Sequence, residues 1–252
     1  KFEFRMPGSS FSIAGPNIGL NTIVAESLKQ FADTLASSGD PRKDTLKLIK
    51  DTINNHKRII FNGNNYADEW VAEAERRGLS NLKSTVDALP HFVDPKNIRL
   101  FTEHHIFTEA EMRSRCDILL EGYSKTIAIE AQTMLEMSRK EIMPAVAAYE
   151  EALSRAALDK CRLGANLSNS MEKKLLVQIS AISGDLYEKV DALEDALMSA
   201  KEVGETLAEA KAFRAEVIPA MNELRAAADR LETLVGEKYW PFPTYGDLVF
   251  SV

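Results

Sequence analysis

The spacing of apolar residues along the chain predicts a protein built mainly of helices. From about Pro16 to Ser37, and again from about Arg42 to Lys57, apolar side chains recur mostly three or four residues apart, as along one face of a helix. A polar loop separates the two segments. The apolar sets are Ile18, Ile23, Val24, Leu28, Phe31 and Leu35 in the first helix, and Leu46, Ile49 and Ile53 in the second.

Capping signals mark several further helices. Asp68 can cap a short helix that ends near Gly78, and a helix over 84–89 is expected to stop at Pro90. Asp94-Pro95 has the order typical of a helix start. The capping box Thr108-Glu109-Ala110-Glu111 predicts the start of a long helix over 108–158, kinked at Pro144.

The second half of the chain carries two regular apolar runs and then a different kind of segment. The first run comprises Leu175, Ile179, Ile182, Leu186, Val190, Leu193 and Leu197, and the second spans residues 207–234. Either the two runs pack as an antiparallel hairpin that reverses near Gly204, or they form one very long helix. Residues 237–252 hold two prolines among several aromatic residues and are expected to be non-helical. Such a tail docks on its own helical bundle or on a neighbouring subunit.

Residues 1–5 alone have the alternation of a strand. Phe2 and Phe4 point to one face, and Lys1, Glu3 and Arg5 point to the other. A carboxylate can bind a divalent cation, and basic groups can contact phosphate, so this face suits metal-assisted phosphoryl transfer. The alternative is a solvated strand face with an ordinary ion pair. The fold class predicted is mainly α, with one N-terminal strand followed by helices and a long helical bundle.

Composition and charge narrow the function classes. The 252 residues carry 31 basic and 38 acidic side chains, a net charge of −7, which argues against general binding of nucleic acid. The chain has no apolar run of the length that a membrane span requires. Two cysteines without a motif favour a reducing, cytoplasmic location. The chain opens without Met or a signal segment, which suggests a fragment of a longer protein.

Several longer blocks carry a family resemblance: Lys1-Phe2-Glu3-Phe4-Arg5, Ile13-Ala14-Gly15-Pro16-Asn17, Asn55-His56-Lys57-Arg58-Ile59-Ile60-Phe61-Asn62-Gly63-Asn64-Asn65-Tyr66, Leu82–Pro90, Phe107-Thr108-Glu109 and Trp240-Pro241-Phe242-Pro243-Thr244-Tyr245-Gly246-Asp247. Together these blocks resemble glutamine synthetase, most closely the large type III bacterial form. The resemblance therefore spans nearly the whole chain.

The resemblance implies an ATP-dependent ligation of glutamate and ammonia through γ-glutamyl phosphate. In the family's strand, the carboxylate that Glu3 matches binds a catalytic Mg²⁺ or Mn²⁺. The arginine that Arg5 matches contacts the transferring phosphoryl group or the substrate carboxylate. Lys1 matches a position near the nucleotide phosphates that is commonly arginine, so a bidentate contact is not expected there.

The resemblance also implies a domain plan and an assembly. Residues 1–140 would form the C-terminal part of the catalytic domain, and residues 141–252 a helical extension with an aromatic tail. The family's other metal ligands and its ATP pocket lie upstream, so this chain alone should be inactive. A large homo-oligomeric ring is expected, without nucleic acid or membrane partners. The alternative function is a non-catalytic helical module for oligomerisation or for binding a regulator.

Two other polar segments allow a functional and a plain interpretation. His104-His105 lies between Glu103 and Glu109 and invites a metal hypothesis, but adjacent helical residues diverge by about 100° and no zinc-type spacing is present. Residues 62–65, Asn-Gly-Asn-Asn, form either a plain turn or a subunit contact.

Overall fold

The protein is mainly helical, as its sequence predicts. The structure, a computed structural model, describes residues 11–164, 166–243 and 245–250, and within them it contains no strand. The strand predicted over residues 1–5 lies outside the described residues. The helices are α1 (Ala14–Ala36), α2 (Pro41–His56), η1 (Lys57–Ile59), α3 (Asp68–Arg76), α4 (Thr85–Phe92), α5 (Pro95–Glu103), α6 (Glu109–Met137), η2 (Ser138–Ile142), α7 (Met143–Leu163), α8 (Ser170–Lys201), α9 (Thr206–Ala212), η3 (Phe213–Val217), α10 (Ile218–Glu232) and α11 (Tyr245–Phe250).

The chain divides into two compact units between Cys116 and Asp117, inside α6. Unit 1 lies before this point and unit 2 after it. The predicted boundary between the catalytic domain and the helical extension, at residue 140, falls within η2 and does not coincide with the division into units. It stays a prediction.

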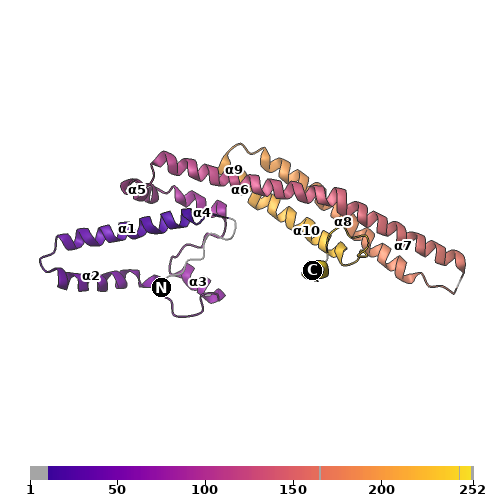
Figure 1. The fold of residues 1–252 in the computed structure, drawn as a ribbon, viewed down its shortest axis with the longest axis horizontal. Coiled ribbons are helices and arrows are strands. Elements are labelled where there is room, and N and C mark those ends of the chain that lie inside the picture. The colour runs from indigo at the N-terminus through magenta and orange to yellow at the C-terminus, as the bar shows by residue number, and fades with distance from the viewer. Residues whose placement is uncertain (1–10, 165, 244, 251–252) are drawn as a thin grey trace. The chain divides into compact units, whose positions relative to one another are not determined.

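Unit 1 is a set of short helices around a small core. Figure 1 shows α1 and α2 as a pair joined by a short loop, and α1 packs against both α2 and α5. Its buried apolar side chains come from α4, α5 and the start of α6: Val86, Phe101, Met112 and Cys116. The ring of Phe101 lies 6.0 Å from that of Phe92 and 5.6 Å from that of Phe107, measured between centroids. The core of unit 1 therefore lies at α4–α6 and leaves α2 without a buried residue.

Local signals fix the helix ends in unit 1 largely as expected. Ser84 caps α4 by accepting from the backbone N–H of Asp87, at 3.3 Å. The capping box of α6 is complete, because Glu111 Oε2 accepts from the Thr108 N–H and Thr108 Oγ1 accepts from the Glu111 N–H. Gly78 ends α3 with φ of +72°, a left-handed conformation that glycine adopts without a steric penalty.

Three details of the predicted elements are wrong. The N-cap of α3 is Ala67 instead of Asp68, which is the first helical residue. Pro90 lies inside α4, which continues to Phe92 because proline removes only the hydrogen bond of its own nitrogen and the later N–H groups still find acceptors. Residues 245–250 form α11, because the extended backbone imposed by Pro241 and Pro243 applies to the residues before them.

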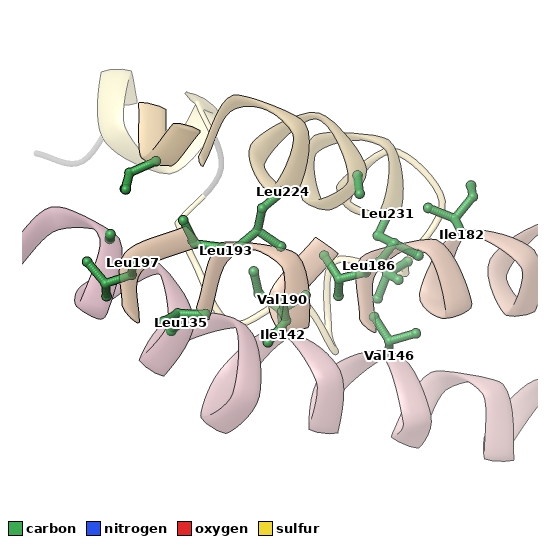
Figure 2. Packing of buried hydrophobic residues seen from close by; sticks show 14 of the residues in the cluster. Leu135, Ile142, Val146, Ile182, Leu186, Val190, Leu193, Leu197, Leu224 and Leu231 are labelled. Carbon is green, nitrogen blue, oxygen red and sulfur yellow. The ribbon is translucent and has the colours of Figure 1, made fainter. Parts of the chain in front are cut away.

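Unit 2 is a helical bundle in which α8 is the central element. It packs against α7 and α10, and Figure 2 shows its leucine and valine side chains between those of the α6–α7 run and those of α10. The chain reverses at residues 202–205, so the hairpin alternative is confirmed. Six of the seven predicted apolar positions on α8 are buried: Ile179, Ile182, Leu186, Val190, Leu193 and Leu197.

Two prolines in unit 2 are accommodated by the same local device. A π-helical turn precedes Pro144 (η2) and another precedes Pro219 (η3), each closed by an N–H that bonds five residues back, Met143 to Ser138 and Ile218 to Phe213. Because the wider turn moves the carbonyl that the proline ring would otherwise strike, the helical path continues. The expected disturbance at Pro144 is thus a π turn.

The aromatic tail docks on its own unit. Tyr239, Trp240 and Phe242 pack against the helical core of unit 2. The rings of Tyr239 and Tyr149 lie 5.2 Å apart, and those of Trp240 and Phe242 lie 6.1 Å apart with their edges facing. Across the described ranges, no helix combines the length and the apolar character needed to cross a membrane.

Candidate functional sites

The residues with predicted chemical roles, Lys1, Glu3 and Arg5, lie outside the described residues. Over 11–164, 166–243 and 245–250, the structure places no three His, Cys, Asp or Glu side chains close enough together to hold a metal ion. The described residues thus provide no metal site of their own. Four other polar or hollow features stand out, two in each unit.

The first feature joins α1 to α5. His104 Nε2 lies 2.8 Å from Glu26 Oε2, and both side chains are largely buried. Hydrogen bonds from Gln30 and then from His104 lower the pKa of Glu26. His105 follows with φ of +53° and ends α5. The first histidine of the pair therefore links two helices, and the second makes a turn.

The second feature is a loop held by one arginine. Arg77, near the end of α3, donates through Nη1 to the carbonyl oxygens of Ile60 at 2.9 Å and Arg58 at 3.2 Å. Its Nε donates to Glu73 at 2.5 Å. Hydrogen bonds from Arg76 and Arg77 lower the pKa of Glu73 from 4.5 to about 2. Arg77 therefore fixes residues 57–60 against α3.

Aromatic packing closes the same cluster. The Phe61 and Trp70 rings stack with centroids 4.2 Å apart, and the Arg77 guanidinium lies 5.5 Å from the Trp70 ring. Gly63 is required here, because a Cβ atom at that position would lie 2.6 Å from the Phe61 ring. The Asn-rich turn at 62–65 is thereby presented to solvent on a fixed base. The sequence did not identify Arg77, because its partners are carbonyl groups 17 and 19 residues away.

The third feature is a groove of about 520 Å³ in unit 2. It lies between the α6–η2 run, α10 and the tail. Its walls combine apolar side chains with a few polar groups, chiefly Met134, Met137, Met221, Arg225, Trp240 and Phe242. Met134 and Met137 lie on α6 and Met221 lies on α10, so no local pattern could have revealed the groove.

A largely buried ion pair also joins α7 to α8. The Glu172 side chain is 4% exposed and accepts a hydrogen bond from Lys160 Nζ. This bond is the main reason why the pKa of Glu172 is lowered. The pair fixes the start of α8 against α7 through Glu172 Oε1, while Oε2 is buried without a hydrogen-bond partner among the described residues.

Comparison with known proteins identifies the family that this chain resembles. Residues 44–160 match the family described as "Glutamine synthetase C-terminal domain". A glutamine synthetase of Butyrivibrio fibrisolvens is 41% identical over 99% of this chain, and a type-3 glutamine synthetase of Dictyostelium discoideum is 34% identical over 99%. A glutamine synthetase of Bacteroides fragilis is 28% identical over the whole chain. The chain spans only 35–36% of the length of these relatives.

Proposed function

The chain carries the C-terminal domain of the glutamine synthetase family. We therefore propose that it is the C-terminal portion of an enzyme that uses ATP to join glutamate and ammonia. The observation that supports this is the similarity to three glutamine synthetases over 99–100% of the chain. In the proposed reaction, the γ-phosphoryl group of ATP passes to the γ-carboxylate of glutamate, giving ADP and γ-glutamyl phosphate. Ammonia then displaces the phosphate and forms glutamine.

Within this enzyme, the opening segment would supply part of the metal and phosphate site. We propose that Glu3 is one ligand of a divalent cation, Mg²⁺ or Mn²⁺, which neutralises phosphate charge when bound. Arg5 would contact the transferring phosphoryl group or the glutamate carboxylate through its planar guanidinium. Lys1 would contribute a single positive charge near the nucleotide phosphates. One carboxylate cannot hold a metal cluster, so the 252 residues alone should be inactive.

The test uses the full-length protein that contains this chain. Glu3→Ala should abolish γ-glutamyl transfer and weaken Mn²⁺ binding, measured by calorimetry, while leaving the assembly unchanged. Glu69→Ala, on the exposed side of α3, is the matched control and should keep both activity and metal affinity. Normal turnover in Glu3→Ala would overturn the metal role, and a full-length protein without ligase activity would overturn the proposed function.

We also propose that the helical extension takes part in forming a homo-oligomer. Support comes from α11, whose Leu248, Val249 and Phe250 side chains are 64–80% exposed. Large apolar side chains gathered on one short helix are typical of a contact surface. Phe250→Glu in the full-length protein should lower the mass measured by light scattering, and an unchanged mass would contradict this role for α11. The sparse cysteine content, two residues in 252 without a disulfide-type spacing, supports the proposed cytoplasmic location.

A further inference from the structure

One face of α2 is apolar, regular and uncovered. Leu46, Ile49 and Ile53 recur at i, i+3 and i+7, so they share one face of the helix; we refer to them as the α2 stripe. Their side chains are 67%, 51% and 54% exposed, and no residue of α2 is buried. Each of these residues is of a type usually found inside a folded protein.

A charged row borders the α2 stripe on the same helix. Lys43, Lys47 and Lys50 recur at i, i+4 and i+7, are exposed, and are centred about 90° around the helix from the stripe. A helix with one charged row and one aliphatic row is amphipathic, and the aliphatic row of such a helix is normally buried. A 16-residue helix is also only marginally stable in water without tertiary packing. α1 packs on α2 but leaves the α2 stripe open.

We propose that the α2 stripe packs against the part of the glutamine synthetase polypeptide that lies outside this chain; the inference rests on the proposed function. The relatives are almost three times as long as the aligned chain, so most of their polypeptide is available as a cover. α2 also lies at the start of the matched family domain, residues 44–160.

The distribution of exposed apolar groups supports this choice of partner. On α1, Val24 and Leu28 are 54% and 60% exposed and lie one helical turn apart. In unit 2, by contrast, the regular apolar positions of α8 are already covered by α7 and α10. Regularly spaced apolar residues are thus left exposed on both α1 and α2, whereas the regular apolar set of α8 is covered.

The size of the surface favours a covalently attached partner over a free one. Three aliphatic side chains offer on the order of 300 Å² of apolar surface, against about 800 Å² that each partner buries in a standard protein–protein interface. A tether raises the effective concentration of its two ends, so a surface too small for free association is sufficient within one polypeptide. A second copy of this chain would lack that advantage.

The first experiment measures thiol alkylation in the full-length protein. Ile49→Cys places a thiol in the α2 stripe, and Lys47→Cys places one about 200° around the same helix, in the charged row. Both are made in a background without the exposed Cys161. We expect Ile49→Cys to react at least tenfold more slowly than Lys47→Cys. Rates within twofold of each other would overturn the inference.

The second experiment identifies the cover without altering the sequence. Photo-leucine, incorporated in place of leucine in the full-length protein, should cross-link Leu46 to a peptide outside the 252 residues. Mixing ¹⁴N- and ¹⁵N-labelled protein separates cross-links within one polypeptide from those between copies. A cross-link between copies, a cross-link confined to the 252 residues, or none from Leu46 would each overturn the inference. Because neither readout uses ligase activity, an inactive protein with a covered stripe would refute the proposed function alone.

Discussion

Each unit contains a helix with regularly spaced apolar residues, but these residues are buried in unit 2 and exposed in unit 1. On α8, in unit 2, six regularly spaced apolar residues are buried, and Leu186 and Leu193 are completely inaccessible. On α2, in unit 1, the equally regular Leu46, Ile49 and Ile53 remain more than half exposed. Both helices formed where the pattern predicted them. An amphipathic pattern therefore identifies the face of a helix that is suited to packing, but it does not identify which polypeptide packs against that face.

The units also differ in what holds them together. Unit 2 has one continuous apolar core, to which α6, α7, α8, α10 and the tail contribute. Unit 1 has a small core and relies in addition on polar links, such as His104 with Glu26 and Arg77 with two carbonyl groups. The removal of apolar volume should therefore damage unit 2, whereas changes to charged groups should loosen unit 1.

The largest effect is expected from one substitution made in both regions. Leu186→Ala opens a cavity in a fully buried site and should lower the free energy of unfolding of unit 2 by about 2–5 kcal/mol. Leu46→Ala, in the exposed α2 stripe, should change the stability of the 252-residue chain by less than about 0.5 kcal/mol. Urea unfolding followed by Trp240 fluorescence measures the first and circular dichroism the second. If both substitutions lowered the free energy of unfolding equally, the proposed difference in burial between α8 and α2 would be wrong.

A smaller effect is expected in the polar cluster of unit 1. Arg77→Lys keeps the charge but loses the planar group that reaches the Ile60 and Arg58 carbonyls together. We expect a loss of about 1–2 kcal/mol and faster amide exchange over residues 57–66. Arg76→Lys is the matched control, since Arg76 is exposed and contacts Glu73 alone. If both variants exchanged at the wild-type rate, Arg77 would not hold the loop.

The sequence predicted the helices of both units well, for a physical reason. Periodicity and capping are local properties, and local properties are sufficient to place α1, α2, α6 and α8 within a few residues. The errors at Pro90 and in residues 245–250 came from extending the restrictions of proline beyond the residues they govern. Residues 139–145 and 214–220 share the short repeat Arg-x-Glu-Ile/Val-x-Pro-Ala. The structure shows that each copy contains a π turn before its proline.

Candidate sites were harder to predict because they depend on contacts between distant residues. The groove takes its walls from several helices and the tail, and Arg77 takes its partners from a loop that precedes α3. The link between Glu26 and His104 spans 78 residues. The sequence pattern within one segment does not predict contacts with residues far away in the chain. The role of Glu3 depends on ligands outside the chain and stays a prediction for the same reason.

The smallest effect we expect is a difference in acid sensitivity between the units. In unit 1 the pKa of Glu73 is about 2, and that of Glu26 is also lowered. A carboxyl group with a lower pKa in the folded state stabilises the fold above its unfolded pKa of about 4.5, and this contribution is lost as the pH falls toward the folded value. In unit 2 hydrogen bonds from basic side chains lower the pKa values of Glu136, Glu172 and Glu194 in the same direction, whereas burial raises the pKa of Glu150.

Because the lowering of the pKa is largest for Glu73, unit 1 should loosen first between about pH 4.5 and 2. Trp70 and Trp240 report on the two units separately, so Trp240→Phe and Trp70→Phe give one fluorescence signal for each. Glu73→Gln, in the Trp240→Phe background, should be less stable than its parent at pH 7 but should lose less stability on acidification. The effect is modest, because Glu73 is partly open to solvent. If Glu73→Gln left the acid transition of Trp70 unchanged, the polar links would not distinguish unit 1 from unit 2.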